Sequence, residues 1–138
     1  MATITETATS FFDAAESGKG WESASQHCHP DATFSAQSDA LADVTTIEAY
    51  CGWMAGILAV MPDASYEIKS AATDAERNNV VVAAVFHGTH TGEGGPLPPT
   101  GKSTSTEYAF VVDFDGDKVS HVTKIWNSQY AIEELGWA

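Results

Sequence analysis

The sequence predicts one α+β domain in which a curved, mostly antiparallel sheet wraps around N-terminal helices and leaves a cone-shaped internal pocket. Helical periodicity is confined to the first half of the chain, and long alternating β runs fill the second half. The length of 138 residues suits a single domain over residues 1–138. Long hairpin strands that curl around an amphipathic helix leave an open mouth, which is a common place for a ligand pocket.

The first half contains the helical signals. Apolar residues recur at helical spacing over residues 4–17, where Thr3 and Glu6 have the spacing of a capping box. A second such pair, Thr45 and Glu48, precedes an apolar stripe that Pro62 ends. Between these helices the sequence predicts a short helix over 21–28, a turn at 29–31 and a strand over 32–36.

The second half reads as hairpin strands. The predicted strands cover residues 66–71, 80–91, 104–114 and 119–126, with a loop rich in Gly and Pro over 92–101. Asp115-Gly116-Asp117 has the composition of a hairpin turn. Ser128 is expected to cap a last short helix that runs to Leu135. Alternation places Tyr108 and Phe110 on one strand face and Glu107 on the other.

The composition excludes several classes of partner. Nineteen acidic residues against six basic ones give a net charge of −13, which argues against nucleic acid and against an anionic membrane surface. The acidity fits a well-solvated surface, or a cationic partner. No stretch of 18 apolar residues and no signal-peptide pattern occur, so we expect a cytoplasmic protein.

No cofactor is expected from the motifs. Cys28 and Cys51 have neither metal-site nor disulfide spacing, and we expect both to be reduced and buried. His27 and His29 have metal-ligand spacing, but no third ligand follows at a telling distance. The sequence contains no nucleotide-binding motif, so we predict that neither a metal nor an organic cofactor is needed.

Three stretches carry a family resemblance: Gly88-Thr89-His90-Thr91-Gly92-Glu93 with Pro98-Pro99-Thr100-Gly101-Lys102, then Asp115-Gly116-Asp117-Lys118-Val119, then Trp126-Asn127 with Glu134-Leu135-Gly136. Together they resemble the SnoaL-like polyketide cyclases and related ester cyclases of the nuclear transport factor 2-like fold. The resemblance implies the cone fold, a homodimer through the outer face of the sheet, and cofactor-independent ring closure.

One position departs from that family. The cyclases carry an acid/base Asp on the last strand, and its place here is held by Asn127, whose amide does not titrate. The resemblance implies that Asn127 points into the pocket, and alternation then places His121, Thr123 and Ile125 on the same strand face. There it would donate a hydrogen bond to a ligand carbonyl or an oxyanion, or act as a satisfied polar group at the pocket end.

Two histidines are the other catalytic candidates. His90, within the family-like stretch, is the first choice and His87 the second. Because they are three residues apart on one strand, they should face opposite sides, and one of them can reach the pocket. Each is alternatively a structural or solvated histidine.

The predicted ligand wall is apolar and aromatic, although the same residues could simply fill the core. It comprises Phe34, Tyr50, Trp53, Met54, Tyr108 and Thr123. The sequence therefore predicts a cyclase-type protein that acts on, or binds, a small apolar cyclic or polyketide-like molecule. If it is an enzyme, we expect a cofactor-independent cyclase or isomerase-type lyase. The alternatives are a non-catalytic binding protein, and an isomerase or dehydratase that uses a pocket histidine.

The expected dimer would form through the outer sheet face. Ala109, Val111 and Trp126 are predicted to lie there, opposite the pocket.

Overall fold

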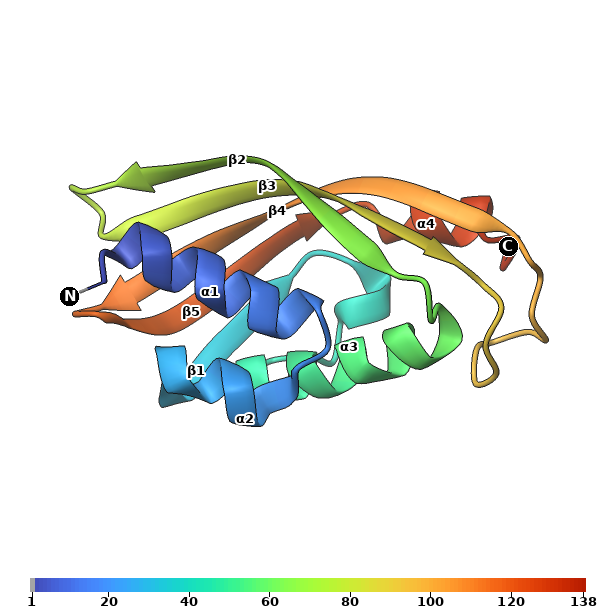
Figure 1. Ribbon diagram of the computed structural model, residues 1–138, viewed down its shortest axis with the longest axis horizontal. Coiled ribbons are helices and arrows are strands. Elements are labelled where there is room, and N and C mark those ends of the chain that lie inside the picture. Colours follow the sequence, from blue (N-terminus) through green and yellow to red (C-terminus); the bar gives the residue numbers. More distant parts are fainter. Residues whose placement is uncertain (1) are drawn as a thin grey trace.

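The computed structural model describes residues 2–138, which form an α+β fold with a curved, unclosed sheet (Figure 1). The strand order is β1-β5-β4-β3-β2, with β1 parallel to β5 and the remaining neighbours antiparallel. The elements are α1 (Ile4–Glu16), α2 (Gly20–Ala24), β1 (Cys28–Ala36), α3 (Ile47–Val60), β2 (Ser65–Asp74), β3 (Asn79–Thr89), β4 (Ser103–Asp115), β5 (Lys118–Trp126) and α4 (Ser128–Glu134), with short 3₁₀ turns at Ser25–His27 and Asp39–Leu41. The predicted fold class is confirmed.

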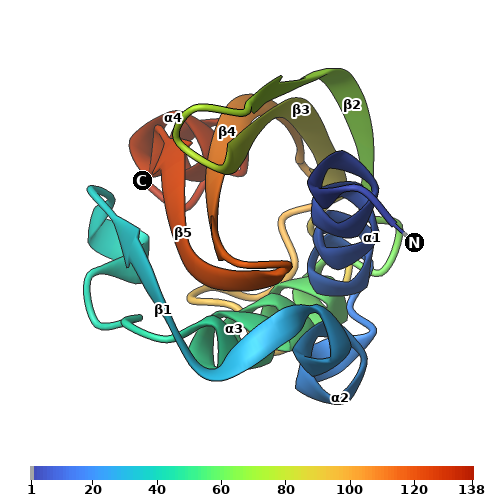
Figure 2. The ribbon, with the colours of Figure 1, turned by 90° about the vertical axis from the view of Figure 1, so that its left-hand side faces the viewer.

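The sheet curls so that its concave side receives the N-terminal helices. Seen along the strands, it bends from β2 round to β1, and α1, α2 and α3 lie across the open side (Figure 2). Phe11 and Phe12 of α1 are fully buried against this side, and Phe12 packs edge-on against Phe110 of β4. The core therefore lies between α1, α3 and the sheet, as the helical periodicity predicted.

Side-chain caps fix where the helices begin. The Thr3–Glu6 capping box is present, with the Thr3 hydroxyl accepting from the Glu6 N–H at 3.1 Å. The second predicted box is wrong by one residue, because Thr46 caps α3 by accepting from the Ala49 N–H. The Thr45 carbonyl instead accepts a hydrogen bond from the Phe34 N–H.

Strand β1 is longer than predicted. The expected turn at residues 29–31 lies inside β1, so that prediction is wrong. Pro30 is tolerated because β1 is an edge strand and its register with β5 is irregular between Cys28 and Thr33. The predicted helix over 21–28 is correspondingly shorter and consists of α2 and a 3₁₀ turn.

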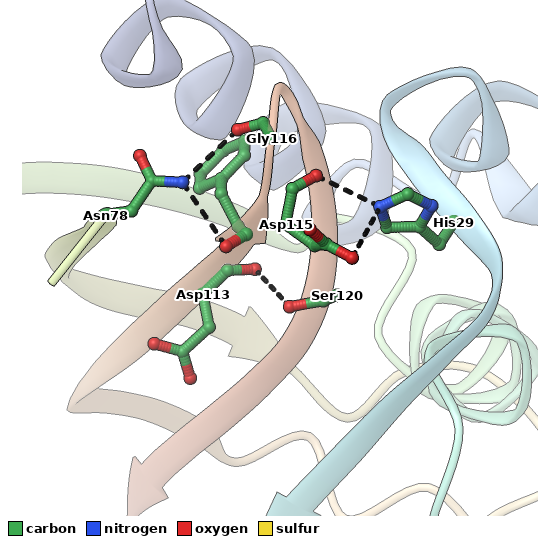
Figure 3. A network of polar contacts seen from close by, with 7 residues as sticks. His29, Asn78, Asp113, Asp115, Gly116 and Ser120 are labelled. Carbon is green, nitrogen blue, oxygen red and sulfur yellow. Dashed lines mark hydrogen bonds and ion pairs between the residues drawn. The ribbon is translucent and has the colours of Figure 1, made fainter.

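A bulge in β5 changes which of its side chains face the core. Asp113 pairs with His121, and Phe114 pairs with Val119, so Ser120 is an extra residue in β5. The Ser120 hydroxyl donates to the Asp113 carbonyl, as Figure 3 shows. Alternation counted from the buried Val119 therefore fails beyond this point.

Beyond the bulge the even-numbered residues point inward. Val122 and Lys124 are buried, and Trp126 packs against the core, whereas Ile125 is 60% exposed. The predicted inward orientation of Thr123 and Ile125 is wrong, and so is the predicted outer position of Trp126. Both errors have one cause, since the strand face was counted from Asn127, and this residue caps α4 and does not point inward.

Polar contacts hold the β4–β5 hairpin to its neighbours (Figure 3). Asn78, in the turn between β2 and β3, donates its side-chain amide hydrogens to the carbonyls of Phe114 and Gly116. His29 Nε2 lies 3.0 Å from the Asp115 carbonyl oxygen and 3.8 Å from its carboxylate. His29 thus contacts the hairpin, and residues 2–138 contain no group of three or more potential metal ligands.

Burial keeps the two thiols inert. Cys28 and Cys51 are buried and unpaired, as predicted. Burial raises the pKa of Cys28 to about 12 and that of Cys51 to about 11. Among residues 2–138, no helix combines the length and the apolar character that crossing a membrane requires.

Two glycines near α3 should respond oppositely to alanine. A Cβ on Gly92 would lie 2.0 Å from the Ala59 carbonyl oxygen, where the loop after β3 contacts the end of α3. A Cβ on exposed Gly56 meets nothing within 4 Å. We expect Gly56→Ala to raise the free energy of unfolding by up to about 1 kcal/mol, because alanine favours helix. Gly92→Ala should lower it by about 1–3 kcal/mol.

Chemical denaturation of both variants and the wild type measures this contrast. Equal effects of the two substitutions would contradict the close approach of the loop to α3.

Candidate functional site

The interior contains a buried ion pair bridged by tyrosine. Lys124 Nζ donates to the Tyr50 hydroxyl at 2.9 Å, and this hydroxyl donates to Glu16 Oε2 at 2.7 Å. The Tyr108 hydroxyl donates to Glu16 Oε1 at 2.6 Å. Lys124 is 5% exposed and Glu16 is 4% exposed. Strands β4 and β5 and helices α1 and α3 thus each contribute one residue to a single network.

Aromatic rings surround the lysine. Its Nζ lies 4.6–5.9 Å from five ring centroids, which belong to Tyr50, Trp53, Tyr108, Phe110 and Trp126. The faces of aromatic rings attract a cation, and this attraction partly replaces the hydration that the ammonium group loses on burial. Burial nevertheless lowers the pKa of Lys124 to about 8, and the negative charge of Glu16 opposes this shift.

The two phenols keep their protons. Burial and the neighbouring Glu16 carboxylate raise the pKa of Tyr50 and of Tyr108 well above the usual range. Both hydroxyls can therefore serve as lasting donors to the carboxylate. Tyr50 also accepts from Lys124, which makes it the link between the two charges.

An apolar cavity of about 160 Å³ lies beside this network. Its wall is formed by Ala40, Trp53, Met54, Ile57, Met61, Phe86, Thr104, Thr106, Trp126, Ala131, Ile132, Leu135 and Trp137. Trp53 and Trp126 face the cavity and also contact Lys124 Nζ. Thr106 is 3% exposed, and its hydroxyl has no hydrogen-bond partner within residues 2–138. The cavity therefore offers an apolar wall and one unpaired polar group.

The predicted ligand wall is divided between two places. Trp53 and Met54 line the cavity. Phe34, Tyr50 and Tyr108 are buried beside it, and Phe34 stacks on Tyr50 at 4.5 Å between centroids. Thr123 lies on the opposite, outer face of the sheet, where it cannot contact a molecule in the cavity.

His90 holds the loop after β3 in place. It is fully buried, and its Nδ1 accepts from Trp137 Nε1 at 2.9 Å. Its backbone N–H donates to the Lys102 carbonyl, and its carbonyl accepts from the Gly101 N–H. It therefore joins both ends of the loop to the C-terminal segment and does not line the cavity.

His87 lies on the outer face, bonded to the Ser105 hydroxyl at 2.8 Å. His90 follows the end of β3 and is buried, so the two histidines point to opposite sides, but neither lines the cavity.

Asn127 is the N-cap of α4. Its side-chain oxygen accepts from the Tyr130 N–H at 3.2 Å, and the residue is exposed. It borders a wide, open groove on the outer side of the sheet and is not part of the cavity wall. The predicted position of Asn127 on the pocket face is wrong, because its side chain turns to the start of α4 and caps that helix. The prediction that Ser128 caps the helix is wrong by one residue.

Sequence reasoning missed the two charged residues of the network. Glu16 was detectable, since it follows Ala8 and Phe12 at intervals of four residues on the buried stripe of α1. Lys124 was missed because the inner face of β5 was counted from Asn127, whereas Val122, Lys124 and Trp126 alternate on that face.

The comparisons agree with this architecture. The family model for SnoaL-like polyketide cyclases matches residues 6–135. No curated protein matches the chain. Among solved structures, IdmH of Streptomyces antibioticus, a provisionally assigned polyketide cyclase, is 20% identical with a TM-score of 0.79, covering 98% of this chain and 99% of its own.

Two further structures share the fold. AclR of Streptomyces galilaeus, a provisionally assigned hydroxylase, is 21% identical with a TM-score of 0.78, and the match covers 98% of this chain and 82% of AclR. A protein of ketosteroid isomerase-like fold from Catenulispora acidiphila, solved with trimethylamine, is 18% identical with a TM-score of 0.71, covering 97% of this chain and 95% of its own. The chain belongs to the SnoaL-like polyketide cyclase family.

Removing one charge of the network should harm the protein more than removing both. Lys124→Met leaves the Glu16 carboxylate in the core without a cation, and we expect a loss of about 3–5 kcal/mol in the free energy of unfolding. Glu16→Gln combined with Lys124→Met removes both charges and should recover most of that loss. Urea denaturation of the single and double variants measures the coupling. Strictly additive losses would show that the two charges do not interact through Tyr50.

Proposed function

We propose that the internal cavity binds a small apolar ring compound with one carbonyl or hydroxyl oxygen, as the substrate or ligand of a cyclase-type protein. The observation that carries this proposal is the unpaired Thr106 hydroxyl in an otherwise apolar wall. A buried hydroxyl without a partner is costly, and a ligand oxygen would supply the missing hydrogen bond.

The volume supports a ligand of one ring. An engineered apolar cavity of about 150 Å³ in another protein admits benzene. The cavity here has nearly the same volume, about 160 Å³. Cyclic ketones of six or seven heavy atoms are therefore suitable probes.

Acid–base chemistry on such a ligand would fall to Lys124. Two of the three cavity tryptophans, Trp53 and Trp126, contact its amine, whereas the third, Trp137, contacts His90. The side chains of Asn127, His87 and His90 lie outside the wall. An ammonium group near a carbonyl oxygen would stabilise the negative charge that develops during enolisation or ring closure. This favours a lysine-based reaction over the alternative of a pocket histidine.

Thr106→Val should weaken binding of a ketone and spare binding of a hydrocarbon. Valine keeps the shape of threonine and removes its hydroxyl. We expect the dissociation constant for cyclohexanone to rise about 3- to 10-fold, which corresponds to the loss of one hydrogen bond between protein and ligand. The matched hydrocarbon methylcyclohexane should bind both proteins alike. Quenching of tryptophan fluorescence reports binding, because three tryptophans line the cavity. Equal weakening of both ligands, or of neither, would count against the hydroxyl as the polar contact.

We also propose a homodimer through the outer sheet face. Ile125 of β5 is 60% exposed and Val81 of β3 is 39% exposed, and both lie on that face around Ala109. An apolar surface of this kind is typical of an interface.

Ile125→Asp should convert the dimer into a monomer. The carboxylate would be buried without a partner at the interface, which costs several kcal/mol. Ile68→Asp is the matched control, since Ile68 is 37% exposed on edge strand β2, outside this patch. Sedimentation equilibrium measures both variants. A monomeric wild type at micromolar concentration would contradict the proposal.

A further inference from the structure

We infer that Lys124 is a nucleophilic amine that forms an iminium ion with a ketone or aldehyde bound in the cavity. The inference rests on the proposed function and specifies its substrate class, small carbonyl compounds. It also specifies the reaction step. The positively charged iminium nitrogen replaces the carbonyl oxygen of the substrate, and it makes the C–H bonds on the adjacent carbon more acidic.

The tryptophan side chains of the cavity wall lie between the Lys124 amine and the space in which we propose that the ligand binds. Trp53 and Trp126 each lie on the cavity wall and each contact Lys124 Nζ, at 5.3 and 4.6 Å from ring centroid to nitrogen. Both tryptophans are only partly buried. Rotation of one indole would therefore open the cavity to the amine, and side-chain rotations of this kind are common on binding.

The step balances without a further reagent. The ammonium first gives one proton through Tyr50 to Glu16, and the neutral amine then donates its lone pair to the carbonyl carbon. The carbonyl oxygen leaves as water with that proton, returned from Glu16, and one of the two protons of the amine. One proton remains on nitrogen, so the product is a protonated iminium and the net charge is unchanged. Tyr50, bonded to Nζ at 2.9 Å, is placed to pass a proton between the amine and Glu16.

Burial gives the amine the necessary reactivity. The titratable groups that face Lys124 are Glu16 from α1, Tyr50 from α3 and Tyr108 from β4. With a pKa of about 8, Lys124 is neutral in roughly one molecule in ten at pH 7. An ordinary lysine is neutral in about one molecule in 2500. Desolvated lysines of this kind are the ones that form Schiff bases.

A structural role alone explains the lysine poorly. A buried ion pair contributes little stability compared with apolar residues of the same size. A perturbed, buried amine beside a ligand cavity is instead typical of a functional site.

Reductive trapping tests the inference. The wild-type protein is incubated with cyclohexanone and cyanoborohydride at pH 7, and adducts are located by peptide mass mapping. We expect the cyclohexyl adduct at Lys124 to exceed that at each exposed lysine by at least about tenfold. The exposed lysines are Lys19, Lys69, Lys102 and Lys118. The rate at Lys124 should rise with pH up to about 8 and then level off, since the neutral amine is the nucleophile.

Two controls test whether the labelling requires the cavity and the Lys124 amine. Adamantanone, which is too large for the cavity, should leave Lys124 unmodified while the N-terminal amine still reacts. Lys124→Arg keeps the positive charge but lacks a nucleophilic amine, so it should lose the adduct at this position. Its cooperative thermal unfolding shows whether it is folded.

The outcomes separate the two proposals. Cyclohexanone that quenches tryptophan fluorescence but leaves Lys124 unmodified would overturn the iminium and leave the proposed function standing. Absence of binding would overturn the proposed function itself. Labelling of Lys124 by adamantanone as readily as by cyclohexanone would show that the amine reacts from outside the cavity, and would also overturn the inference.

Discussion

The burial of an ammonium and a carboxylate in one aromatic core is the constraint on which the rest of the structure depends. Each ion alone would cost several kcal/mol in such surroundings. Tyr50 makes the pair tolerable, because its hydroxyl accepts from Lys124 and donates to Glu16. Helices α1 and α3 and strand β5 must therefore keep their relative positions to within hydrogen-bond distance. The curved sheet and its helices form the frame that holds these three elements together.

This arrangement separates the charges of Lys124 and Glu16 from the apolar cavity. The cavity wall is apolar apart from its threonines, and the charged network lies behind two tryptophans. Asn127 caps α4 at the end of β5, three residues beyond Lys124. The same strand therefore supplies the buried ammonium group and leads directly into the helix whose Ala131 and Ile132 line the cavity.

The sequence was sufficient for most of the fold and for part of the site. Helical periodicity and the Thr3 cap located α1, and alternation located the inward face of β4, because both elements are regular. The phase predicted for β5 was reversed because it was counted from Asn127, which caps the following helix, although alternation itself holds from His121 to Trp126. Trp53 and Met54 were recognised as cavity residues because they share the apolar stripe of α3. Lys124 and Glu16 escaped notice because charged residues are expected on the surface, and a buried pair can be identified only when both partners are in view.

The pairing of β1 with β5 has a consequence for how the protein acquires its site during synthesis. The last strand lies between the first strand and β4, and the hydrogen bond from Tyr108 to Glu16 spans 92 residues of sequence. Contacts of such separation form late, because the entropy of closing the intervening chain opposes them until other contacts have formed. Because Lys124 and Trp126 lie on β5 and Ala131 and Ile132 lie on α4, neither the charged network nor the cavity wall is complete without the end of the chain.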